Sequence, residues 1–200
     1  VHELRQVTFV DGKQVADERR AQGELAKRIT ASADQRKRRS LQQFEKYGLR
    51  GAVTDFGQIL LLFSRASIER YEITYLGPRM LTPTPILTPT RMQASRYKQL
   101  DGPQALAVYR QDQRGHVQHL SVEGEVWVRE SDGLPLHVTL NATDSSSDNT
   151  LREEAVVDYA LSEFGTVLPS QTIHRELRAG MLVTENKFTY GAFHKFGARR

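Results

Sequence analysis

The stretch VQHLSVEGEVWVRESDGLPLHVTLN, residues 117–141, decides the fold. Apolar and polar residues alternate on both sides of Asp132-Gly133, a dipeptide typical of tight turns between antiparallel strands. The alternation predicts strands over 117–123, 125–130 and 134–141, with Gly124 interpreted as a bulge rather than a turn. This part of the chain is therefore predicted to form an antiparallel hairpin.

The same pattern continues along the chain from 104 to 196, with turn residues between alternating runs. Further strands are predicted over 68–76, 91–100, 105–110, 154–162, 168–178 and 181–193. Near the start, 4–10 is predicted to be a strand, and Asp11-Gly12 is the signal of a two-residue hairpin turn. The expected sheet has eight to ten strands.

Helical spacing is confined to the first third of the chain. Segments 17–31 and 34–47 show apolar residues at helical intervals. The most apolar run, 53–64, is predicted to be a short buried helix, with a buried strand as the alternative. Helices followed by an antiparallel meander predict the α+β class. We expect a single domain over 1–200, with the N-terminal hairpin and helices in 1–66 and the meander in 67–196.

Residues 77–90 repeat Leu-Thr-Pro-Thr at 81–84 and 87–90. Proline lacks an N–H and fixes φ, so this segment is not expected to be a central strand. Two interpretations stay open, a surface loop with a small apolar contact and a lid over an apolar cleft.

Composition narrows the function only a little. The chain has no cysteine, which excludes thiolate zinc sites, and its net charge is +4. The basic run at 36–39 fits three interpretations: a solvated helix face, a surface that binds anionic lipid headgroups, or a surface that contacts nucleic acid. We expect no nucleic-acid partner, because no aromatic stacking motif accompanies the run. No run of 18 apolar residues occurs. The start at Val1, inside a predicted strand, suggests that a leader has been removed.

The sequence contains no known catalytic motif, including glycine-rich nucleotide loops, H-E-x-x-H and G-x-S-x-G. His137 and His174 fall on predicted strands and are interpreted as solvated or core-rim residues rather than ligands. Glu153-Glu154 and Asp158 could hold a cation, but no second carboxylate cluster accompanies them. We therefore expect no enzyme activity, no cofactor and no metal.

A resemblance to a known family rests on three motifs in the second half: Gly124-Glu-Val-Trp-Val128, Gly133-Leu-Pro-Leu136, and the final strand around Phe188-Thr-Tyr190. These resemble the LolA and LolB-like periplasmic lipoprotein carriers. The N-terminal Val10-Asp-Gly-Lys13 hairpin is similar to one in uncharacterised secreted bacterial proteins. Arg129 stands where the carriers have an acidic residue.

The resemblance implies a strongly curved antiparallel sheet, a half-barrel, with two or three helices on its concave side. It also implies binding or carriage of a lipid or other hydrophobic ligand in the bacterial cell envelope, in the periplasm or secreted, with an envelope protein partner and peripheral membrane contact. A structural or interaction module with a closed core is the alternative. The residues predicted to line the cleft are Leu60, Phe63, Tyr71, Ile73, Tyr75, Val126, Val128, Leu136, Val138, Phe188 and Tyr190.

Overall fold

The structure is a computed structural model that describes residues 7–17, 46, 56–65, 67–82, 89–100, 109–111, 117–144, 151–191 and 193. The chain forms two compact units, Val1–Ala52 and Val53–Arg200. The prediction of one domain over 1–200 stays a prediction.

In the first unit, β1 (Phe9–Val10) pairs antiparallel with β2 (Lys13–Gln14). Asp11 and Gly12 both have positive φ, 49° and 74°, as a type I′ turn requires. The predicted Asp-Gly hairpin is confirmed. Apart from positions 17 and 46, the helices predicted over 17–31 and 34–47 lie outside the described residues.

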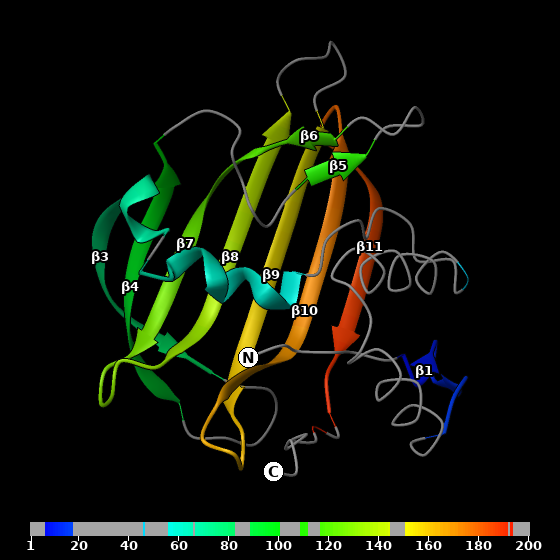
Figure 1. Ribbon diagram of the computed structural model, residues 1–200, viewed down its shortest axis with the longest axis horizontal. Helices are drawn as coiled ribbons and strands as arrows, with labels where there is room; N and C mark the ends of the chain where they lie inside the picture. Colours follow the sequence, from blue (N-terminus) through cyan, green and yellow to red (C-terminus); the bar gives the residue numbers. More distant parts are fainter. Residues whose placement is uncertain are drawn as a thin grey trace, which may run out of the picture. The chain divides into compact units, whose positions relative to one another are not determined.

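The second unit is built on an antiparallel sheet of seven strands in the order β11-β10-β9-β8-β7-β4-β3 (Figure 1). The strands are β3 (Tyr71–Leu81), β4 (Thr90–Gln99), β7 (Ser121–Arg129), β8 (Pro135–Asp144), β9 (Leu151–Leu161), β10 (Val167–Arg178) and β11 (Met181–Thr189). Two short strands, β5 (Tyr109–Gln111) and β6 (Val117–His119), form a separate hairpin. The predicted antiparallel pairing is confirmed for the seven long strands, but β5 and β6 are not part of their sheet, so β4 pairs with β7.

The sheet has two unlike faces. Along β9 the residues at odd positions from Leu151 to Tyr159 are buried, whereas those at even positions are partly buried or exposed. We call the face with the buried odd positions of β9 the inner face. Its centre is aliphatic, with Val138, Leu140 and Val157 at most 1% exposed. The opposite face is the outer face.

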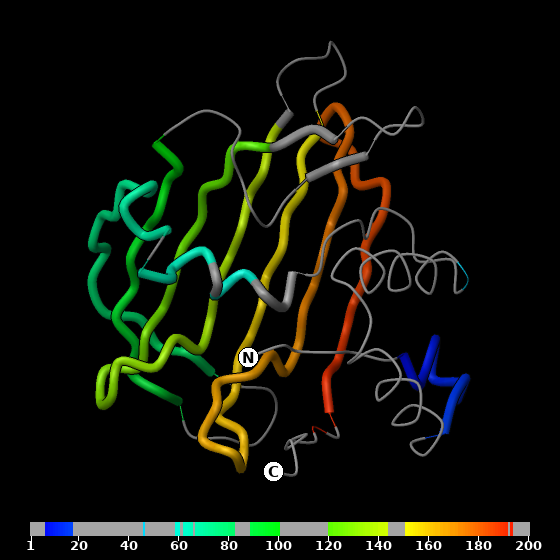
Figure 2. The backbone as a smooth tube through the Cα atoms, in the orientation of Figure 1, coloured from blue at the N-terminus to red at the C-terminus, as the bar shows by residue number. Residues whose placement is uncertain are grey.

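A 3₁₀ helix, η1 (Phe56–Phe63), covers the aliphatic centre of the inner face and contacts β8, β9 and β10 (Figures 1 and 2). A 3₁₀ helix has three residues per turn, so Ile59 and Leu62 lie in line along it. Both are almost fully buried, at 0% and 2% exposure. A shorter 3₁₀ turn, η2 (Ile68–Arg70), leads into β3.

The predicted fold class is wrong. The described elements of the second unit are antiparallel strands and two 3₁₀ helices without an α-helix, and the seven-stranded sheet is unclosed. The half-barrel with two or three helices on a concave side is therefore not found. Within the run at 53–64, residues 56–63 are helical, as preferred, but of the 3₁₀ type. An eight-residue segment is too short to hold an α-helix by itself, so packing on the sheet decides its form.

Gly124 lies within β7 and not in a turn, but the bulge predicted there is wrong, because the register with β8 shifts between Trp127 and Val128 instead. A Cβ at this position would meet the carbonyl oxygen of Thr139 at 2.1 Å. That same oxygen accepts a hydrogen bond from the Tyr97 hydroxyl at 2.7 Å, and the Glu125 amide donates to the Thr139 hydroxyl at 2.9 Å. The side chains of Tyr97 and Thr139 thus enter the ladder between β7 and β8, and only glycine leaves enough room.

The beginning of the proline-containing segment 77–90 is also described. β3 extends beyond the predicted end at 76 to Leu81, past a bulge between Tyr75 and Gly77, and includes Pro78. In the described sheet β3 pairs only with β4, so a residue without an N–H is tolerated there. Residues 77–81 are thus not in a central strand, as expected, but the interpretation of the segment as a loop or a lid is wrong for them, because they continue β3. Residues 83–88 lie outside the described part.

Candidate functional site

The candidate site is the inner face beneath η1. Ile59 and Leu62 pack in one apolar cluster with residues of β7, β8 and β9, including Val122, Val138, Leu140, Ala155 and Val157. Leu60, Phe63 and Val126 are partly buried against the same cluster. The β-branched and small residues of these strands make a smooth apolar strip, and η1 removes that strip from water.

Aromatic side chains close one end of the strip. Phe63 contacts the Tyr97 ring edge to face, with centroids 4.9 Å apart, and lies 6.2 Å from the Tyr71 ring. Burial, and to a lesser degree the neighbouring Tyr71 and Tyr159, raises the pKa of Tyr97 well above its usual value. Burial likewise raises the pKa of Tyr71. Both phenols are therefore neutral and serve as packing surfaces and hydrogen-bond donors.

The predicted cleft residues do not form one group. Leu60 and Phe63 of η1 pack in one cluster with Tyr71, Val126 and Val138. Leu136 is buried in β8. Val128 is half-buried in β7, and Phe188 and Tyr190 are half-buried near β10. Ile73 and Tyr75 are exposed on β3, at 46% and 64%. Their role in binding stays a prediction.

A buried polar group lies beside the strip on the same face. His174 of β10 is fully buried, and its Nε2 lies 2.5 Å from Oε2 of Glu153 on β9. Asn186 of β11 places its Nδ2 3.3 Å from His174 Nδ1. We call Glu153, His174 and Asn186 the inner polar group. It adjoins the apolar strip because Glu153 pairs in register with Ala142, and His174 with Ala155.

Two further contacts continue this polar region. Glu176, directly opposite Glu153 in the ladder, is 6% exposed and accepts hydrogen bonds from Arg178 at 2.8 Å. The Tyr190 hydroxyl donates to Thr172 at 3.3 Å. In the described part of the chain, no three of these or other His, Asp and Glu side chains are arranged to hold a metal ion.

The sequence reasoning missed the inner polar group. His174 was interpreted as solvated or core-rim, yet it is fully buried. The alternation along β9 could have predicted this burial, because Glu153 occupies an odd position like the buried Leu151, Ala155 and Val157. A carboxylate at a position that alternation assigns to the core indicates a buried polar site.

The outer face carries a second histidine–carboxylate pair. His137 Nδ1 lies 2.6 Å from Asp158 Oδ1, and the His137 ring packs on Trp127 with centroids 4.6 Å apart. The Trp127 indole donates to Glu125 at 2.9 Å. Since the Asp158 side chain is 41% exposed, this pair is accessible to solvent.

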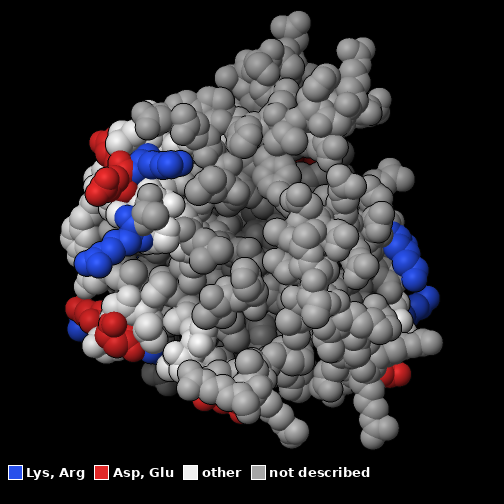
Figure 3. Space-filling model, in the orientation of Figure 1, with Lys and Arg blue, Asp and Glu red and all other residues white. Residues whose placement is uncertain are grey.

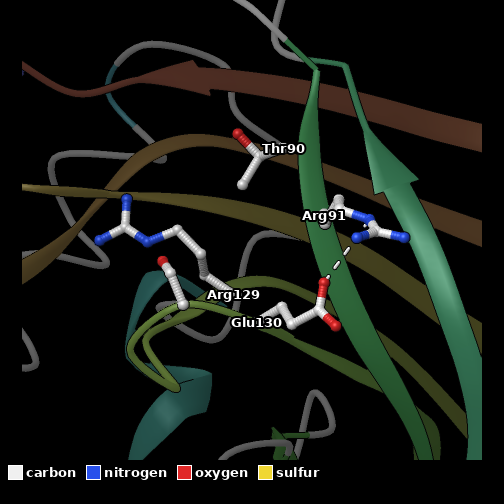
Figure 4. A pocket seen from close by; sticks show the side chains of 5 residues that line it. Thr90, Arg91, Arg129 and Glu130 are labelled. Atoms are coloured by element: carbon white, nitrogen blue, oxygen red, sulfur yellow. Dashed lines mark ion pairs between the residues drawn. The ribbon is translucent and has the colours of Figure 1, made fainter.

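An open hollow of about 230 Å³ lies between β4 and the β7–β8 turn and is lined by Thr90, Arg91, Arg129, Glu130 and Ser131. Figure 4 shows these side chains. Its two guanidinium groups already face carboxylates. Arg129 forms a two-point pair with Asp132, which lowers the pKa of that carboxyl group, and Arg91 lies 3.6 Å from Glu130. None of the predicted cleft residues lines this hollow, so we do not assign the ligand to it.

Figure 3 shows acidic and basic side chains intermixed on the side of the molecule where Figure 1 draws β3 and β4. In the part of the chain that the structure describes, no helix is both long and apolar enough to span a bilayer.

No family model, curated protein or solved structure matches this chain. The resemblance to the LolA and LolB-like carriers stays an inference from the quoted residues.

Proposed function

We propose that this protein binds a ligand with a long apolar chain on the inner face without catalysing a reaction, and that η1 is the cover that the chain displaces. The observation that supports this proposal most strongly is that η1 is a long 3₁₀ helix packed on the sheet through apolar side chains. A 3₁₀ helix of eight residues is unusually long for a hydrogen-bond geometry poorer than that of an α-helix. Its described contacts with the sheet are apolar side-chain packing.

The free energy gained by burying the side chains of η1 is similar to the free energy gained by burying the apolar chain of a ligand on the same strip. Burying Ile59, Leu62 and Phe63 contributes about 6 kcal/mol in total, at roughly 2 kcal/mol per large apolar side chain. A twelve-carbon chain buried on the same strip contributes about 9 kcal/mol, at about 0.8 kcal/mol per CH₂, before the cost of ordering it. The exchange of one for the other is therefore balanced closely enough to be reversible.

The proposal is tested by titrating the protein with cis-parinaric acid, a fatty acid whose fluorescence rises in apolar surroundings. We expect saturable binding by the wild type. Leu62→Ala weakens the cover but leaves the sheet intact, so its apparent affinity should rise at least about tenfold. Leu60→Ala, on the same helix but only partly buried, is the control and should give a smaller gain.

The alternative is a structural or interaction module with a closed core. In that case Leu62→Ala lowers the free energy of unfolding, and neither the wild type nor the variant binds the probe. A location in the periplasm or outside the cell, and an envelope partner, belong to the proposal through the family resemblance alone.

A further inference from the structure

We infer that the inner polar group takes the polar end of the ligand, and that this end is a cation that donates hydrogen bonds, such as a primary ammonium. The inference rests on the proposed function and adds the ligand class. It is carried by one oxygen atom, Oε1 of Glu153.

Glu153 is deeply buried, with 3% of its side chain exposed. Its Oε2 accepts from His174, but within the described part of the chain its Oε1 has no hydrogen-bond partner. A buried acceptor without a donor costs about 1–3 kcal/mol, and more when it is charged. Native proteins rarely leave such an atom unsatisfied, so Oε1 points to a donor that arrives with a ligand.

The local charge favours a cation. Glu153 and Glu176 face each other across β9 and β10, and Arg178 is paired with Glu176 alone. The Asn186 amide lies at Nδ1 of His174, and Nε2 of the same ring faces Glu153. Among the described residues, the carboxyl groups of Glu153 and Glu176 thus lie beside one guanidinium, that of Arg178. An ammonium group restores the balance and supplies the missing N–H.

The position fits an amphipathic molecule. Glu153 and His174 pair in register with Ala142 and Ala155, which belong to the apolar cluster beneath η1. A chain laid on the strip in place of η1 thus has its end next to Glu153. An anionic headgroup would instead meet two carboxylates.

The experiment compares dodecylamine, dodecyltrimethylammonium and dodecanoate by isothermal titration calorimetry on the intact chain, below their micellar concentrations. Dodecylamine should bind at least about tenfold more tightly than dodecanoate. Dodecyltrimethylammonium has the same charge but no N–H, and should lie between them. Glu153→Gln should remove the preference for the amine, whereas Glu154→Gln, one residue away on the outer face, should keep it.

Each outcome separates the two proposals. Binding of dodecanoate as tight as that of dodecylamine, equal binding of the two cations, or an unchanged preference in Glu153→Gln overturns the headgroup inference and leaves apolar-chain binding standing. Binding of none of the three overturns both. Should Glu153→Gln not fold, the wild-type comparison of the three amphiphiles decides the matter.

Discussion

Two histidine–carboxylate pairs lie on opposite faces of the same sheet. On the inner face His174 meets Glu153 at 2.5 Å, and on the outer face His137 meets Asp158 at 2.6 Å. The groups and distances are nearly the same, but the exposures are not. The inner side chains are 0% and 3% exposed, whereas the outer ones are 15% and 41% exposed.

The comparison shows that burial, rather than contact geometry, sets what such a pair does. Water screens the outer pair and solvates either partner when the other is removed. Water does not reach the inner pair, so each polar atom there needs a hydrogen-bond partner in the protein or in a ligand. Four matched pairs of substitutions, each comparing a buried or tightly packed position with a more open one, test this effect of burial, from the largest expected effect to the smallest.

Replacing either histidine by alanine compares the pairs directly. His174→Ala leaves Glu153 buried without its donor and opens a cavity, so the free energy of unfolding should fall by about 4 kcal/mol. His137→Ala should cost about 1 kcal/mol or less. Urea denaturation measures both values; equal losses would contradict the assigned difference in burial.

The second pair of variants adds one methyl group to a glycine. In Gly124→Ala the new Cβ meets the Thr139 carbonyl oxygen at 2.1 Å, so about 3 kcal/mol should be lost as the ladder shifts. Gly191→Ala enters open space and should be nearly neutral. Thermal unfolding gives the difference, and a stable Gly124→Ala would show that β7 and β8 are not so close.

Adjacent valines on β9 compare the faces within one strand. Val157 is fully buried on the inner face, so Val157→Ala should cost about 2 kcal/mol. Val156 is half-buried on the outer face, so Val156→Ala should lower the free energy of unfolding clearly less, by about 1 kcal/mol. Chemical denaturation of both variants measures this; a larger loss at Val156 would reverse the assignment of the faces.

The smallest effect at neutral pH is expected from Tyr97→Phe, which removes the hydrogen bond to Thr139 at a cost of about 1 kcal/mol. Its pH dependence is more informative. Because burial raises the pKa of Tyr97 in the folded chain, its contribution is complete below pH 10, where the unfolded tyrosine ionises, and is lost as pH rises further.

The alkaline limb of the stability curve should therefore be flatter in Tyr97→Phe, by up to about 1.4 kcal/mol per pH unit above pH 10. Tyr75→Phe, at an exposed position on β3, is the control and should keep the wild-type slope. Identical curves for all three proteins would mean that the Tyr97 phenol is open to water.

Local rules predicted much of this fold. The Asp11-Gly12 and Asp132-Gly133 turns and the alternation of the long strands depend on backbone sterics and on the two-residue period. The helix type at 56–63 could not be predicted, since a short apolar run takes the form that packs best on its partner. The half-barrel with helices on its concave side was wrong, because the curvature of a sheet and the elements that cover it depend on how all strands pack together, which no single segment encodes.

The candidate site divides in the same way. Phe63, Tyr71 and Val138 were predicted on the correct face because periodicity assigns faces. Ile73 and Tyr75 lie at the same alternate positions of β3 as Tyr71 and were assigned to the same face. They are nevertheless exposed, because β3 is the end strand and η1 does not cover them. Glu153 and His174 were missed because composition predicts charged residues to be solvated, whereas their burial depends on strand order.

Hydrogen exchange measured by mass spectrometry, with and without dodecylamine, tests most directly whether η1 is a displaceable cover of the inner face. The account predicts faster exchange of the amides of 56–63 when the amphiphile is bound, together with slower exchange in β8 and β9. Binding that leaves exchange in 56–63 unchanged, or that slows it along with the sheet, would contradict the account, because the chain would then lie elsewhere.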